Sequence, residues 1–157
     1  MSTRSTTHFR DTPDGESTAI IYRHSDGYPS GAGADLLTFI EQVKVQCEGT
    51  SYGTRFNDSS YLAAKYVAFL TNDFAKHSAY NYETGEQGEP KLLNFGSVGI
   101  LNQDPMDIEY RYIVVCDGSP TIYVQEVLSR WDSGEDDSEP VFVEDAINAE
   151  LAMQGSM

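Results

Sequence analysis

The order of hydrophobic and polar positions predicts two short strands, two amphipathic helices and then further strands. Residues 6–10 and 17–23 each predict a strand, and the turn-forming residues 11–15 between them predict an antiparallel hairpin. Apolar side chains at helical spacing predict a first helix over 34–47 and a second over 61–75. Both helices carry one apolar face, so each needs a surface to cover.

The second half of the chain returns to strand patterns. Residues 97–101, 108–115 and 121–127 each predict a strand, and residues 143–153 have weak helical spacing. We therefore expect an α+β fold. It should contain an antiparallel sheet of about five strands, two main helices packed on one face, and a weak C-terminal helix.

Charge divides the chain into two parts. Ten Lys plus Arg against twenty-five Asp plus Glu give a net charge of −15 over 157 residues. This balance argues against a general nucleic-acid binder, which needs clustered cations to neutralise phosphates. Residues 131–157 carry eight acids and no Lys or Arg, which leaves 10 − 17 = −7 for residues 1–130. We predict a single domain over 1–130 and an acidic tail over 131–157 that can include a short helix.

The acid excess has two explanations, which composition does not separate. An acidic surface with only four lysines is typical of adaptation to high salt and favours a halophilic source. An acidic patch that mimics nucleic acid or docks on a basic partner would give the same balance.

Targeting and cysteine patterns predict an intracellular protein that does not enter a membrane. The polar N-terminus lacks the apolar run of a signal peptide, and no stretch approaches the roughly 18 apolar residues of a membrane helix. Cys47 and Cys116 are far apart and form no C-x-x-C pair, so we expect two ordinary buried thiols rather than a disulfide framework or a zinc ribbon.

A polar, glycine-rich segment between the second strand and the first helix is the candidate binding site. We expect Arg23, His24, Asp26 and Tyr28 to contact a ligand or partner. Three further residues are possible contributors: Arg4, Gly31 and Gly33. The glycine spacing matches neither the Rossmann motif nor the P-loop, and the segment has no Lys to meet a phosphate. The competing interpretation is structural: two turns that bring the helix back over the sheet.

Catalytic and metal signals are weak. His8, His24 and His77 are dispersed over different elements without metal-ligand spacing, and no serine or cysteine lies in a recognisable nucleophile motif. We predict no metal site, no cofactor and no catalytic residue, and we consider an enzyme less favoured than a binding protein.

The loop also carries a family resemblance. The segment Arg23-His24-Ser25-Asp26-Gly27-Tyr28-Pro29 with Gly31 and Gly33, the block 61–65 and the strand 110–114 resemble small proteins of phages, archaeal viruses and prophages. The resemblance implies a viral or mobile-element context and a location in the host cytoplasm, but no established activity transfers with it.

Together these observations favour a small viral, non-enzymatic binding module that contacts a host or viral macromolecule, most simply a protein. The alternative is a protein that binds or processes a nucleotide or another small phosphorylated ligand through the segment 23–33. Oligomeric state and the identity of the partner stay open.

Overall fold

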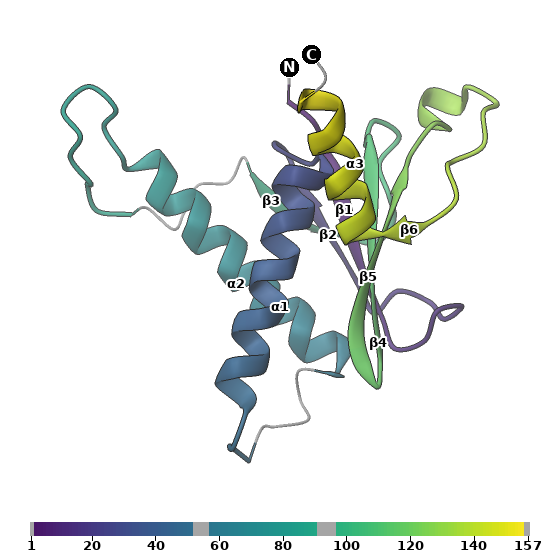
Figure 1. Cartoon of the computed structure of the whole chain (residues 1–157), viewed down its shortest axis with the longest axis horizontal. Helices are drawn as coiled ribbons and strands as arrows, with labels where there is room; N and C mark the ends of the chain where they lie inside the picture. Colours follow the sequence, from purple (N-terminus) through teal and green to yellow (C-terminus); the bar gives the residue numbers. More distant parts are fainter. Residues whose placement is uncertain (1, 52–56, 91–96, 156–157) are drawn as a thin grey trace.

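The computed structural model describes residues 2–51, 57–90 and 97–155 and has an α+β fold built on one six-stranded sheet (Figure 1). The strands are β1 (Ser5–Arg10), β2 (Ala19–Arg23), β3 (Val98–Leu101), β4 (Tyr110–Asp117), β5 (Ser119–Glu126) and β6 (Val141–Phe142). Their order across the sheet is β3-β2-β1-β4-β5-β6.

The predicted helices are confirmed. α1 spans Ala34–Cys47, and α2 spans Ser59–Ser78, three residues longer than expected at its C-terminal end. The Asp58 carboxylate accepts hydrogen bonds from the Ser60 and Tyr61 amides, and so satisfies two of the donors that a helix leaves unpaired at its start. The weak C-terminal helix is present as α3, Val143–Gly155.

The sheet corrects the expectation of a purely antiparallel arrangement with about five strands. β1 forms the predicted hairpin with β2, but on its other side it runs parallel to β4, with Thr7 opposite Tyr112. The sixth strand, β6, adds two residues at the edge beside β5. The β1–β4 pairing joins segments about a hundred residues apart, which is why local periodicity did not predict it.

One face of the sheet packs against the helices. Alternation along β1 and β4 directs Phe9, Tyr112 and Val114 to this side, and all three are fully buried. They share a core with Leu36 of α1 and Tyr66 of α2, which lies 5.6 Å from Phe9 between ring centroids. Figure 1 shows α1 and α2 on this side of the sheet, where they cross one another.

The opposite face carries no α-helix among the described residues. Alternation directs Thr6, His8 and Arg10 of β1 to this side, together with Arg111 of β4 and Gln125 of β5. We call it the helix-free face. The two faces therefore differ in cover, and the helix-free face combines these polar and charged side chains with the apolar ones of Ile113, Val115 and Tyr123.

The acidic C-terminal region packs against the body through α3. Val143 is fully buried and belongs to the same core. The Ser30 amide donates a 2.5 Å hydrogen bond to the Glu150 carboxylate, and so joins α3 to the turn before α1. The Asp137 carboxylate accepts hydrogen bonds from the Leu128 and Ser129 amides. Part of the negative charge of this region is therefore paired within the chain.

Candidate functional site

Arg23, the first predicted site residue, points into the protein. It is 5% exposed on the helix-covered face. Its guanidinium donates to the Asp35 carboxylate at 2.7 Å and to the Ser25 carbonyl at 2.7 Å, and it lies 5.2 Å from the centre of the Phe74 ring. These contacts join β2, the following loop and both main helices. Arg23 supports the loop from beneath and is not available at its surface.

The other predicted residues have separate hydrogen-bond partners. The Nδ1 atom of His24 is 2.9 Å from the Tyr22 hydroxyl. Asp26 is exposed with a left-handed backbone (φ 56°), and it accepts a 3.3 Å hydrogen bond from the Tyr28 hydroxyl. Arg4 is joined to Asp107 at 2.5 Å. Neither of the two hollows described below is lined by Arg23, His24, Asp26, Tyr28 or Arg4, and their role in partner binding stays a prediction.

The two glycines of the segment serve close packing. A Cβ atom on Gly31 would lie 2.4 Å from the Asp26 carbonyl oxygen, and one on Gly33 would lie 2.7 Å from Val143 of α3. Both positions are too close for any side chain to fit without a shift.

The amides that a phosphate would need are already in use. The Gly27 amide donates to the Thr3 carbonyl, the Gly31 amide to the Tyr28 carbonyl, and the Ser30 amide to Glu150. Because a carboxylate of the chain itself lies at this turn, the geometry supports the structural interpretation of the segment better than an anion site.

The helix-free face instead brings together a chain of polar groups that the sequence did not single out. The Ser17 hydroxyl oxygen lies 2.6 Å from His8 Nδ1, and His8 Nε2 lies 2.8 Å from the Asp104 carboxylate. Arg10 Nε donates to the Ser17 hydroxyl at 3.1 Å. The four residues come from β1, the turn before β2 and the segment after β3, so they are adjacent only in the folded chain.

Asp104 is the centre of this network. Burial alone would raise the pKa of its carboxyl, but hydrogen bonds from His8, Thr6 and Arg111 outweigh burial and hold the pKa well below its usual value. Arg111 also pairs with Asp137 at 3.0 Å, so its charge is balanced by two carboxylates. Asp104 is consequently ionised at neutral pH and can only accept hydrogen bonds.

A shallow pocket of about 540 Å³ opens beside this network. His8, Arg10 and Asp104 contribute polar groups, while Ile113, Val115 and Tyr123 contribute apolar surface. Convergent polar groups beside an apolar wall are the usual composition of a ligand site. We call this arrangement the Ser17 site.

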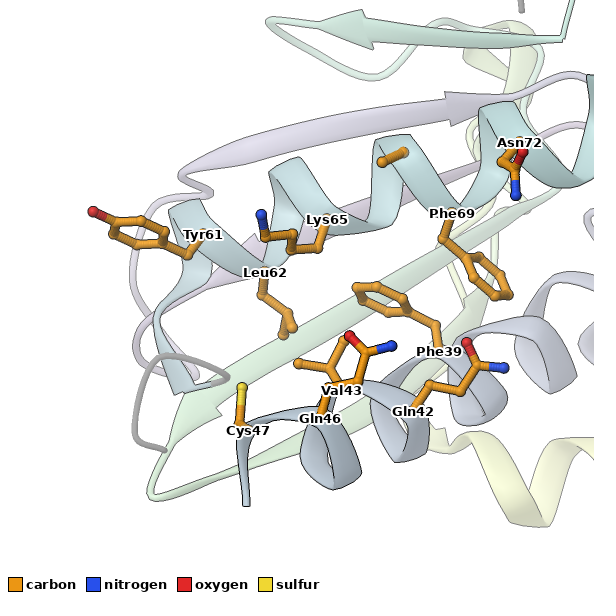
Figure 2. A pocket seen from close by; sticks show the side chains of 11 residues that line it. Phe39, Gln42, Val43, Gln46, Cys47, Tyr61, Leu62, Lys65, Phe69 and Asn72 are labelled. Carbon is orange, nitrogen blue, oxygen red and sulfur yellow. The ribbon is translucent and has the colours of Figure 1, made fainter. Parts of the chain in front are cut away.

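A second hollow, of about 720 Å³, lies between α1 and α2 (Figure 2). Its floor is apolar and includes Phe39 and Leu62, which are 3% and 1% exposed. The rings of Phe39 and Phe69 approach to 5.4 Å between centroids across it. Its rim is polar and consists of Gln42, Gln46, Lys65 and Asn72, all exposed. We call it the inter-helix groove.

Neither a metal site nor a similar known protein indicates what this chain does. Within residues 2–51, 57–90 and 97–155, no group of three or more His, Cys, Asp and Glu side chains is arranged to hold a metal ion. Comparison with protein-family models, with curated proteins and with solved structures returns no match to this chain. Nor, over the same residues, is any helix long and apolar enough to cross a membrane.

Sequence reasoning missed both hollows for identifiable reasons. His8 was visible as a histidine in a strand, but its partners are 9 and 96 residues away, at Ser17 and Asp104. One signal was available: a histidine and an arginine, His8 and Arg10, share one face of β1 by alternation. The inter-helix groove depends on how far the two helices separate, which their individual apolar stripes do not specify.

Proposed function

We propose that the protein is a binding module whose inter-helix groove receives an amphipathic helix of a partner protein. The observation that carries this proposal is the groove itself, with an apolar floor between two helices and a polar rim. A helix that lays its apolar side chains into such a groove is a recurrent mode of peptide recognition. The expected viral or mobile-element context supports a partner from the host or the virus.

The dimensions and charge of the groove favour one kind of occupant. Its lining on α2 extends from Tyr61 to Asn72, which at 1.5 Å per residue is roughly 16 Å, or three helical turns. Lys65 is the one charged side chain among the described lining residues, in a chain of net charge −15. A partner helix with apolar residues three or four positions apart and an acid facing Lys65 is complementary to this surface.

A displayed library of helical peptides, selected against the full chain, tests the proposal. We expect enrichment of peptides with an apolar stripe and a neighbouring Asp or Glu. Val43→Glu, within the groove, should reduce their affinity at least tenfold, because it places a charge in an apolar contact. Val45→Glu is the matched control: Val45 lies on the same helix, is 60% exposed and is outside the lining.

Lys65→Glu sharpens the test, because reversal of this charge should shift the enriched peptides from acidic to basic.

Cys47 lines the groove and provides a position for a fluorophore that reports peptide binding. Cys116 is buried, and burial raises the pKa of its thiol to about 11, which disfavours labelling at that position. Peptides that bind equally to Val43→Glu and wild type would overturn the proposal. Self-association lost in Val43→Glu would replace the partner with a second copy.

A further inference from the structure

The hydrogen bonds of the Ser17 site have only one consistent direction when the His8 imidazole is neutral. Asp104 is ionised and accepts, so His8 Nε2 must carry a proton and donate to it. In the neutral imidazole, Nδ1 then has no proton and accepts. Arg10 Nε can only donate to the Ser17 oxygen, so the serine uses its own proton to donate to His8 Nδ1. The serine proton is therefore directed at a base.

This order of groups has the requirements of nucleophilic catalysis. A nucleophile and its base are within hydrogen-bond reach, and a third group orients the base. The nitrogens are used in the reverse order from most serine triads, but the roles are set by geometry rather than by the identity of the nitrogen. Arg10 adds a cation beside the reacting oxygen, and no carboxylate of the described residues lies within ion-pair distance of it.

We propose that Ser17 is the nucleophile of a hydrolase site that cleaves esters of small carboxylic acids, with His8 as general base and Asp104 as the positioning residue. This inference uses the helix-free face and does not depend on the inter-helix groove. Ser17 does not itself line the pocket of about 540 Å³, but its two hydrogen-bond partners, His8 and Arg10, do. The pocket provides room for the acyl group next to Ser17, and its wall of Ile113, Val115 and Tyr123 favours an apolar one.

The reaction has two balanced steps. The Ser17 oxygen forms a bond to the carbonyl carbon of the ester while its proton moves to His8 Nδ1. The bond from that carbon to the alcohol oxygen then breaks, and the alcohol leaves with the proton from His8. Water next attacks the acylated serine, gives its proton to His8, and releases the carboxylic acid as Ser17 regains its hydrogen.

A fluorophosphonate probe and p-nitrophenyl acetate test this site in the full chain. Wild type should take up one probe molecule, located on the peptide that contains Ser17, and should turn over the ester. Ser17→Ala should abolish labelling and lower kcat/KM by about 10³-fold or more. Ser119→Ala is the matched control, since Ser119 is exposed at the start of β5 and lies outside the hydrogen-bonded chain of Ser17, His8 and Asp104.

Two further measurements separate catalysis from a structural role. Asp104→Asn should lower kcat about 10²-fold with KM unchanged, while Thr6→Val, which removes another donor to the same carboxylate, should retain most activity. Wild type unfolded in urea should not be labelled. Absence of Ser17 labelling in folded wild type, equal labelling in urea, or full activity in Ser17→Ala would each overturn the inference.

Discussion

Two arginines on opposite faces of the sheet make similar ion pairs in very different surroundings. Arg23 lies under the helices, where its side chain is 6% exposed beside Asp35. Arg111 lies on the helix-free face, where it pairs with Asp104 and Asp137 and remains 19% exposed beside a pocket. Both sites are rich in charge, but only the second is open to a ligand. A polar cluster under helices maintains the fold, whereas one on an uncovered face can also take part in chemistry.

The largest expected effect is the difference in unfolding free energy between variants of the two arginines. Arg23→Met should lower the free energy of unfolding by about 3 kcal/mol, because it removes a buried guanidinium, its pair with the partly exposed Asp35 and the donor to the Ser25 carbonyl. Arg111→Met should cost only about 1 kcal/mol, because Asp104 keeps the hydrogen bonds from His8 and Thr6. Urea unfolding followed by circular dichroism measures both values. An equal loss in the two variants would contradict the comparison.

The next largest effect is a loss of stability at alkaline pH, which comes from Tyr66 on the helix-covered face. Burial raises the pKa of Tyr66 to about 12, above the usual value of 10.0. Its neutral form is therefore favoured by folding, and this contribution is complete below pH 10 and is lost as pH rises through 12. We expect the chain to lose about 2 kcal/mol of stability over this interval through Tyr66 alone.

Tyr66→Phe removes this loss, so the stability of the variant should fall less steeply between pH 10 and 12. Tyr82→Phe is the matched control because Tyr82 is 80% exposed. Urea midpoints at a series of pH values measure the difference. If Tyr66→Phe and Tyr82→Phe follow the same curve, burial of Tyr66 does not set the alkaline limit.

The smallest expected effect is a loss of stability at acid pH, which comes from Asp104 on the helix-free face. The lowered pKa of Asp104 means that its carboxylate stabilises the fold above its unfolded pKa, near 4, and that this contribution fades as pH falls through the folded value. Asp104→Asn should therefore cost about 1 kcal/mol at pH 7 and progressively less below pH 4. Thermal melts at pH 7 and pH 3 give the comparison, and a deficit that is the same at both pH values would contradict it.

Local patterns were sufficient for most of the elements but not for the sheet. The span 34–47 is the observed α1, and the predicted hairpin is the observed β1–β2 pair, because helical spacing and turn formers act over a few residues. The parallel pairing of Ser5 with Tyr110 is a long-range contact with no local signal. Alternation predicts two faces for every strand, but it does not predict which strands become neighbours.

For the candidate sites too, some features followed from the sequence and others only from the tertiary structure. The sequence alone identified residues 23–33 as a polar, glycine-rich segment between the second strand and the first helix. Only the tertiary structure decided that Arg23 points inward, and that Ser17, His8 and Asp104 form one hydrogen-bonded chain. The physical reason is range: turn and helix preferences act between neighbours, whereas the direction of a proton and the depth of a groove depend on distant segments held by a common sheet.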